Sequence, residues 1–297
     1  MIQECSVERN SQNKQLNVVY PKGFPLCAYY NDMDRLVARQ VPWHWHEEIE
    51  MIVAIQGRAL VHVYQQEIVL EKGDALWINA GALHQVEKMT EEETILYSVV
   101  FSHRLLDGED DSVFAKKYML PLIQAKKLSF VKFDHQNAEE AAIAKKIQEA
   151  YLACQKEMYG YEFIVRERMC EVCLFVLSWH HERDVAIREE KEVDRLKQMM
   201  AYLQRYYMDP IRLIQLAKHA NISEREVLRC FQQHLKESPM QVLMKYRLMK
   251  ACELLGTSEK SIGEIASACG FGDASYFAKQ FKRLLHRSPS AYRAMMK

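Results

Sequence analysis

The sequence predicts an α+β protein in which an N-terminal β-barrel or sandwich is followed by helices and then by an all-helical domain. Three observations support this class. Short apolar segments separated by turn residues fill positions 15–102, apolar residues recur at helical spacing from Asp111 onward, and the C-terminal third contains an internal repeat of about 50 residues. A chain of 297 residues is long enough for two domains, each with its own core.

The composition is that of a folded protein, because 49% of the residues are hydrophobic and Gly and Pro are few. The N-terminal stretch is polar and lacks the apolar core of a signal peptide, and no apolar run approaches the roughly 18 residues of a membrane span. Eight dispersed cysteines fit reduced thiols better than a disulfide framework. We therefore expect a cytoplasmic protein with no membrane partner.

The charge is distributed unevenly, although the net charge is zero. Residues 192–297 contain 18 Lys and Arg against 10 Asp and Glu, a net +8, so residues 1–191 carry a net −8. A basic half joined to an acidic one is expected when only one domain meets the phosphates of nucleic acid. The N-terminal half then has a different task.

Six apolar segments separated by turns are the predicted strands: 16–20, 50–55, 59–64, 68–70, 75–78 and 95–101. Residue types that bind metals lie among them. His44, His46 and Glu50 have the same parity, so on one continuous strand their side chains would point to one face. With His84 from another strand, they form a set of the kind that binds iron, manganese, nickel or zinc.

Helices are predicted after these strands. The first ends near residue 120, where Pro121 would break it, a short strand follows at 130–133, and two longer helices cover 138–158 and 161–181. The second of the longer helices is apolar around most of its circumference. We expect one face to pack on the barrel and the rest on a second subunit, which predicts a homodimer. Charged residues 181–194 are the expected linker.

The C-terminal repeat is predicted to contain two helix-turn-helix units. In the second unit, Ser261 and Glu264 form a capping box, Gly270 supplies a left-handed turn, and Asp273 caps the next helix. That helix buries two phenylalanines. Its other face is small and basic enough to enter a major groove, and it consists of Ala274, Ser275, Ala278, Lys279, Lys282 and Arg283.

The first unit repeats this pattern about 50 residues earlier, with Asp209-Pro210 as the expected helix start and Asn221 in the turn. A second capping box opens the following helix. The residues expected on its outer face are Glu224, Arg225, Leu228, Arg229 and Gln232. The connecting helix at 241–255, about 23 Å long, can hold the two outer helices in successive major grooves, which lie about 34 Å apart.

The second unit resembles the DNA-binding domain of the AraC/XylS family of bacterial transcription regulators. The shared pattern reads I-x-E-I-A-x3-G-F-x-D-x-S-Y-F-x3-F-K from Ile262, and S-P-x2-Y-R from Ser288. The N-terminal half resembles two cupin motifs, of which H-x-H-x3-E-x6-G, from His44, is complete. The second, G-x5-P-x-G-x2-H-x3-N from Gly73, departs from the pattern at Asn79 and Lys88.

The resemblance implies a division of tasks along the chain. Residues 1–183 would form a cupin domain that binds a small-molecule effector and dimerises, 184–194 a linker, and 195–297 an AraC-type domain that binds double-stranded operator DNA. In this family the cupin commonly senses an effector without catalysis. The family leans toward activation, which implies RNA polymerase as a partner. We expect a non-enzymatic transcription regulator that requires no cofactor.

Alternatives stay open at the level of the sequence. The four residues His44, His46, Glu50 and His84 either hold a divalent metal ion or line the effector pocket. With Trp43, Trp45 and Trp77, such a pocket would suit a sugar, because aromatic faces stack on sugars, but it would also suit an aromatic acid. The second candidate function is a metal-dependent cupin enzyme fused to a DNA-binding module. A purely architectural DNA-binding protein is disfavoured by the acidic N-terminal half.

Overall fold

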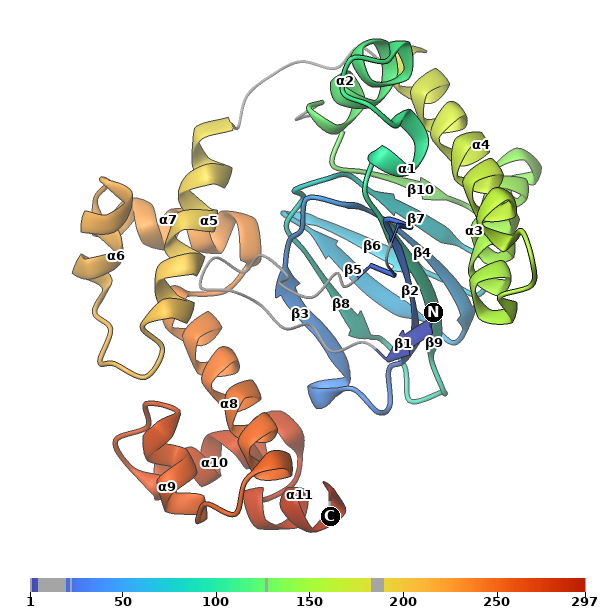
Figure 1. Ribbon diagram of the computed structural model, residues 1–297. Coiled ribbons are helices and arrows are strands. Elements are labelled where there is room, and N and C mark those ends of the chain that lie inside the picture. The colour runs from blue at the N-terminus through green and yellow to red at the C-terminus, as the bar shows by residue number, and fades with distance from the viewer. Residues whose placement is uncertain (1, 5–19, 22, 126–127, 183–189, 297) are drawn as a thin grey trace. The chain divides into compact units, whose positions relative to one another are not determined.

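The structure is a computed structural model that describes residues 2–4, 20–21, 23–125, 128–182 and 190–296 (Figure 1). Contacts within the chain divide these residues into two compact units, which part between residues 182 and 190. Among the described helices, none is both long enough and apolar enough to cross a membrane.

The N-terminal unit is built on two facing β-sheets (Figure 1). The larger sheet has the strand order β1-β2-β9-β4-β7-β10, and the smaller one the order β3-β8-β5-β6. All paired strands are antiparallel except β1 and β2. The bounds are β1 (Ile2–Glu4), β2 (Leu26–Asp32), β3 (Gln40–His44), β4 (Ile49–Gln56), β5 (Ala59–Val63), β6 (Gln66–Leu70), β7 (Ala75–Ile78), β8 (His84–Lys88), β9 (Ile95–Phe101) and β10 (Phe130–Phe133).

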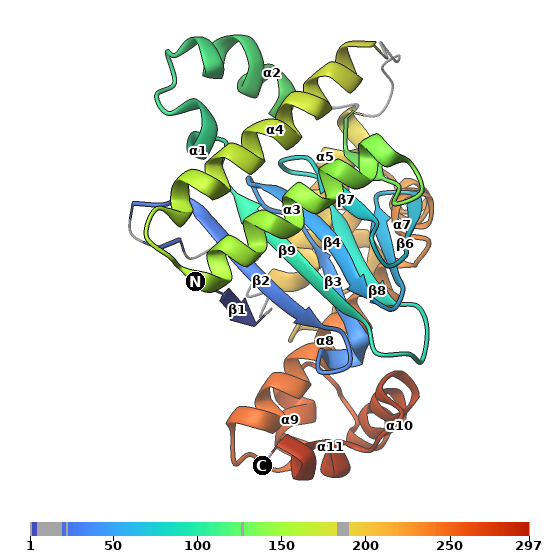
Figure 2. The ribbon, with the colours of Figure 1, turned by 90° about the vertical axis from the view of Figure 1, so that its right-hand side faces the viewer.

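Alternating side chains give the larger sheet two apolar faces. Toward the smaller sheet it presents residues such as Ile52 and Leu76, which form a core with apolar residues of β5, β6 and β8. On the opposite face, Met51 and Trp77 belong to a second core that contains residues of helices α3 and α4 (Figure 2). Adjacent residues of one strand therefore face either the space between the sheets or the helices.

Two long helices cover that outer face (Figure 2). α3 (Ala138–Lys156) begins at Asn137, whose side chain accepts hydrogen bonds from two backbone amides of the first turn. α4 (Tyr161–Glu182) follows it, and both helices bury one face in the shared core. The shorter helical elements are η1 (Val37–Arg39), α1 (Arg104–Asp107), η2 (Ala115–Met119) and α2 (Leu120–Ile123).

Most of the predicted elements of this unit are present, and the differences have local causes. Segments 75–78 and 130–133 are strands with those bounds. The additional strands are β1, β2, β3 and β8, and β8 is hard to predict because its sequence HQVEK has a single apolar residue. Pro121 does not break a helix. Residues 113–123 form one continuous helical run, in which Pro121 directly follows the wider π-helical turn η2. The predicted strand at 16–20 lies outside the described residues except for Tyr20.

The second unit is entirely helical (Figure 1). Its helices are α5 (Glu190–Arg205), α6 (Leu213–Ala220), α7 (Glu224–Leu235), α8 (Pro239–Thr257), α9 (Ile262–Ala268), α10 (Ala274–Leu285) and α11 (Pro289–Met296). α6 and α7 form the first helix-turn-helix, α9 and α10 form the second, and α8 connects them. The turns correspond as well, because Asn221 and Gly270 both have positive φ, 52° and 77°. A sheet domain followed by an all-helical one confirms the predicted α+β class.

One predicted boundary in this region needs correction. α6 begins after Arg212, not at Asp209-Pro210, because the amide of Asp209 instead closes a turn onto the carbonyl of Tyr206 at 2.9 Å. The side chain of Gln215 then accepts the Arg212 amide at 2.6 Å and caps the helix. Of the expected linker 184–194, residues up to 189 lie outside the described residues, and the remainder opens α5.

Replacing Gly270 by alanine is expected to lower the free energy of unfolding by more than about 2 kcal/mol. Gly270 has a φ of 77°, which disfavours any L side chain, and an added Cβ would lie 2.6 Å from the carbonyl oxygen of Tyr207. An added Cβ at Gly272 would meet no atom within 4 Å, so Gly272→Ala is the matched control. Urea denaturation checks the prediction, and equal stability of the two variants would contradict it.

Candidate functional site

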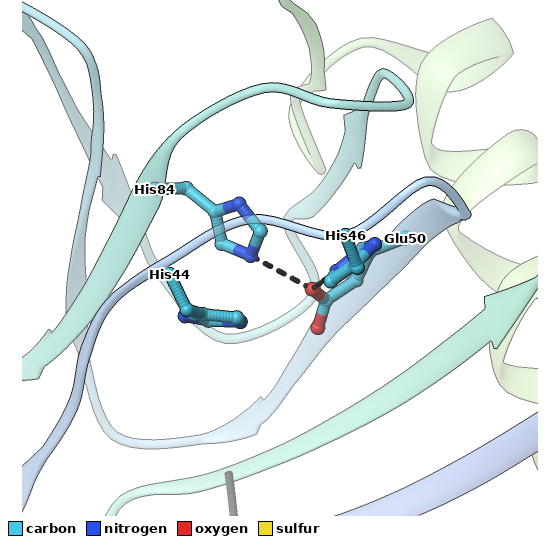
Figure 3. Close-up of side chains that lie close together, drawn as sticks. All are labelled: His44, His46, Glu50 and His84. Carbon is cyan, nitrogen blue, oxygen red and sulfur yellow. Dashed lines mark hydrogen bonds and ion pairs between the residues drawn. The ribbon is translucent and has the colours of Figure 1, made fainter. Parts of the chain in front are cut away.

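Four buried polar side chains converge between the two sheets: His44, His46, Glu50 and His84 (Figure 3). His44 ends β3, His46 lies in the turn before β4, Glu50 lies in β4, and His84 opens β8. One nitrogen or carboxylate oxygen from each lies within 4.8 Å of the others. The structure therefore brings together the four residues that the sequence singles out, which we call the His/Glu cluster.

Parity alone predicts that the cluster lies on one continuous strand, but the structure assembles it from different strands. β3 ends at His44, and the chain turns before β4 begins at Ile49. Glu48, which has the same parity, accepts a hydrogen bond from the Tyr20 hydroxyl at 2.6 Å instead. The cluster forms because β3 pairs with β8, placing His44 opposite His84, while β4 faces them from the other sheet.

Backbone carbonyls orient the three imidazoles. In each histidine, Nδ1 lies 2.8–3.0 Å from the carbonyl oxygen of the residue two positions away. A carbonyl oxygen can only accept a hydrogen bond, so each Nδ1 carries a proton. This arrangement directs Nε2 of each ring to bind either a metal ion or an additional proton.

The carboxylate of Glu50 requires positive charge beside it. Its Oε2 lies 3.1 Å from Nε2 of His46 and 3.0 Å from Nε2 of His84. Burial would raise the pKa of Glu50, but hydrogen bonds from both imidazoles hold it well below its usual range. Burial lowers the pKa of His46, and the hydrogen bond to Glu50 outweighs this effect, so the His46 pKa is raised. The cluster thus favours a charged carboxylate with a cation or protons next to it.

A narrow pocket extends from the cluster between the sheets. His44 and Glu50 lie at one end, and the pocket continues past apolar side chains to Asn31 and Ser98. Because the pocket is narrow, any occupant is short and slender unless the walls move. Asn31 and Ser98 are not predicted from the sequence, because a single polar residue in an apolar strand belongs to no motif.

The prediction that tryptophans line this pocket is wrong for the described residues that form its walls. Trp77 lies opposite Met51 in the sheet and shares its face, so its indole is buried in the core with the helices. Trp43 packs against the ring of His62 with 5.8 Å between centroids. Neither of these two indoles lines the pocket, and the expectation that Trp77 binds the ligand is corrected.

Asn79 replaces the usual proline of the second cupin motif and has a clear structural role. Its side-chain amide donates to the carbonyl of Leu122 in α2 at 2.9 Å, while its Oδ1 accepts the amide of Ala80 at 2.8 Å. Two residues later, the amide of Gly81 donates to the carbonyl of His46 at 2.7 Å. These bonds hold the loop that leads to His84 against both α2 and the His46 turn.

The first helix-turn-helix unit presents its predicted outer face to solvent. α7 buries Val227 and Phe231. The Ser223 hydroxyl caps its first turn, and the carboxylate of Glu226 returns to the Ser223 amide at 2.9 Å. The residues predicted on the outer face, all of which are exposed, are Glu224, Arg225, Leu228, Arg229 and Gln232.

The second unit has the same organisation. α10 buries Phe277 and Phe281, and Asp273 caps it by accepting two backbone amides, at 2.6 and 3.3 Å. Among the residues predicted on its outer face, Ala278 is half-buried and the others are exposed: Ala274, Ser275, Lys279, Lys282 and Arg283. Short side chains therefore occupy the first turn of this face, and long basic ones its later turns.

Two family models match the chain, a helix-turn-helix domain at residues 216–295 and a cupin domain at residues 37–100. YdeC, an uncharacterised HTH-type transcriptional regulator of Bacillus subtilis, is 27% identical over 91% of this chain and 92% of its own length. The HTH-type transcriptional activator RhaS of Klebsiella pneumoniae is 26% identical over 86% and 88%. The crystal structure of ToxT from Vibrio cholerae O395 is 12% identical, covers 85% of this chain and 91% of that one, and has a TM-score of 0.46.

The matched ranges coincide with the sites described above. The cupin match contains the whole His/Glu cluster, and the helix-turn-helix match contains α7, α9 and α10. The relatives that extend over most of the chain are regulators, which excludes the alternative of an enzyme. The chain belongs to the AraC/XylS family and is a DNA-binding transcription regulator with an N-terminal cupin domain for a small-molecule effector.

Proposed function

We propose that the outer faces of α7 and α10 bind operator DNA under the control of an effector in the cupin pocket. The observation that carries this proposal is that each helix buries one face and exposes basic side chains on the other. α8 connects the two helix-turn-helix units. Its 19 residues span about 28 Å, close to the roughly 34 Å between successive major grooves. A regulator acts where the DNA lies, so we place the protein in the cytoplasm.

Operator affinity is expected to fall steeply with salt, and Lys282→Ala is expected to flatten the log–log salt dependence by about one unit. Lys282 is exposed on α10, where a phosphate contact would release one counterion without reading a base. Fluorescence anisotropy with operator and random duplexes at several salt concentrations measures both effects. Lys145→Ala, an exposed residue of α3, is the control. A loss confined to one operator position would instead place Lys282 at a base edge.

We also propose that the protein is a homodimer that associates through α4. Phe163 and Leu174 on this helix are 80% and 65% exposed, and Ile164 is 44% exposed. Eleven residues are close to three helical turns, so Phe163 and Leu174 lie on one face. Met169 and Val172, on another face, are fully buried in the unit's own core. A second copy of the same helix would cover the exposed apolar face.

Leu174→Glu is expected to convert most of the full-length protein to monomer at micromolar concentration, because it places a charge in the centre of the proposed contact. Val113→Glu is the matched control, since Val113 is also exposed, at 60%, but lies outside α4. Sedimentation equilibrium gives the result. A wild-type protein that is monomeric, or a Leu174→Glu variant that remains dimeric, would contradict the α4 interface.

We further propose that the His/Glu cluster holds one divalent metal ion. Neighbouring ligands in an octahedral site, each about 2.1 Å from the ion, lie about 3.0 Å apart. This is close to the spacing of Glu50 Oε2 from Nε2 of His46 and of His84, which is 3.1 and 3.0 Å. Bound there, the ion would supply a Lewis-acidic centre that attracts an oxygen of the effector. The four buried residues of the cluster hold the Nε2 atoms in place and exclude water.

Activation of transcription is the proposed direction of control. RhaS of Klebsiella pneumoniae, which is similar to this chain over most of its length, is named an activator. By analogy, we propose that the bound protein contacts RNA polymerase and raises initiation. Transcription with purified polymerase from a template that carries the operator tests this, and a lower transcript yield on adding the protein would make it a repressor.

A further inference from the structure

We propose that Asn31 and Ser98 form a second polar site in the cupin pocket and bind a hydroxyl group of the effector, which identifies the effector as a short hydroxy acid. This inference rests on the proposed effector pocket and its metal ion. To that proposal it adds two residues that bind the effector and the chemical class of the effector.

Asn31 has an unused hydrogen-bond acceptor inside the pocket. It lies on β2, is only 5% exposed, and lines the pocket. Its Nδ2 donates to the Ser98 hydroxyl oxygen at 3.2 Å, but its Oδ1 has no partner among the described residues. A buried acceptor without a partner destabilises a protein, and native structures contain few of them. A ligand that donates to Oδ1 would account for this one.

Ser98 completes a pair with complementary capacity. Its oxygen accepts from Asn31, so its own hydroxyl hydrogen is left to donate. Together Asn31 and Ser98 offer one acceptor and one donor, and a ligand hydroxyl group offers one of each in return. Charged groups fit this end of the pocket less well than a hydroxyl. A carboxylate would be repelled by the Asn31 oxygen, and an ammonium group would be buried with no acidic side chain beside it at this end.

The register of the sheet sets the distance between the two polar ends. Ser98 lies opposite Ile52, two residues along β4 from Glu50, which corresponds to about 7 Å. The wall between the ends is apolar and includes Ile52, Val86 and Leu96. A carboxylate at the proposed metal ion, a chain of about two to four carbons along this wall, and a hydroxyl at Asn31 fit that arrangement and the narrow bore.

Matched acids test the ligand class in the full-length, metal-loaded protein. Glycolate, 3-hydroxypropanoate and 4-hydroxybutyrate are compared with acetate, propanoate and butyrate by thermal shift and calorimetry. At least one hydroxy acid is expected to raise Tm by about 3–5 °C near saturation and to bind at least 10-fold more tightly than its partner without the hydroxyl. If no hydroxy acid binds, or each pair binds equally, the inference is wrong, while stoichiometric metal binding would still stand.

The double variant Asn31→Leu with Ser98→Ala separates binding from structure. Because it replaces both partners by apolar groups of similar shape, its Tm without ligand is expected to equal or exceed that of the wild type. The hydroxyl preference is expected to fall to less than 2-fold. A fall in Tm of about 5 °C or more, or an unchanged hydroxyl preference, would show the pair to be structural. If an acid binds but leaves operator affinity unchanged, the proposed control of DNA binding by the effector is wrong, whether or not Asn31 and Ser98 bind the acid.

Discussion

The purified protein is expected to bind one divalent metal ion, and Glu50→Gln is expected to weaken this binding by roughly 100-fold or more. Glutamine retains the shape of the side chain but removes the negative charge that lies 3.0–3.1 Å from two imidazole nitrogens. Calorimetric titration of metal-free protein with Ni²⁺, Zn²⁺ and Mn²⁺ measures the affinities. At 100 times Kd the ion stabilises the fold by about 2.7 kcal/mol, which raises Tm by roughly 5–10 °C.

Two controls separate ligation from general damage. Glu67→Gln changes an exposed carboxylate of β6 and leaves the cluster intact. His84→Ala is compared with His62→Ala, because His62 lies on the neighbouring strand β5 but packs against Trp43. We expect His84→Ala to lose metal binding and His62→Ala to retain it. Equal affinity in the wild type and Glu50→Gln would mean that the ion binds outside the His/Glu cluster.

The helix-turn-helix units could be predicted closely because their signals are local. The Ser261 capping box, the Gly270 turn and the Asp273 cap each involve residues within a few positions of one another, and all three are present in the structure. The exception is Asp209-Pro210, where a turn closed onto Tyr206 takes precedence over a helix start. A proline after a capping residue is compatible with either structure, so sequence alone does not choose between them.

The cupin pocket could be predicted only in part because it is made by long-range pairing. The spacing of a known motif identified the His/Glu cluster, but its assembly from β3, β4 and β8 depends on strand register. Trp77 was assigned to the wrong face for the same reason, since its orientation follows from pairing with Met51. Asn31 and Ser98 are 67 positions apart, and nothing in the sequence near either residue indicates the other.

The first helix-turn-helix unit is expected to provide most of the base specificity, and the second mainly phosphate contacts and register. Arg225 and Arg229 are exposed one helical turn apart on α7. Arginine can bond O6 and N7 of guanine together, a contact that discriminates against other bases by about 1–3 kcal/mol. α10 instead presents Ala274 and Ser275 in its first turn, whose short side chains offer little beyond a methyl contact and one hydroxyl bond.

In a competing arrangement, the two arginines would form ion pairs with neighbouring glutamates instead of contacting bases. Glu226 is already engaged, because its carboxylate accepts the Ser223 amide at 2.9 Å and the Ser223 hydroxyl at 2.7 Å. These bonds are the first cause of its lowered pKa, and the charge of Arg229 contributes less. Among the described residues, Arg225 has no ion pair with Glu224 or Glu226. The structure therefore leaves the Arg225 guanidinium available to a base edge.

Operator selection from random duplexes with the wild type, Arg229→Ala and Lys279→Ala is the decisive measurement. Arg229→Ala is expected to lose guanine preference at one or two positions of each half-site, at a cost of about 1–3 kcal/mol for the cognate operator. Lys279→Ala is expected to weaken all duplexes alike and retain the base preferences. Lys218→Ala, an exposed residue of α6, controls for a general loss of positive charge. If Lys279→Ala alone erased base preference, while variants of Arg225 and Arg229 selected the wild-type operator, the roles of the two units would be reversed.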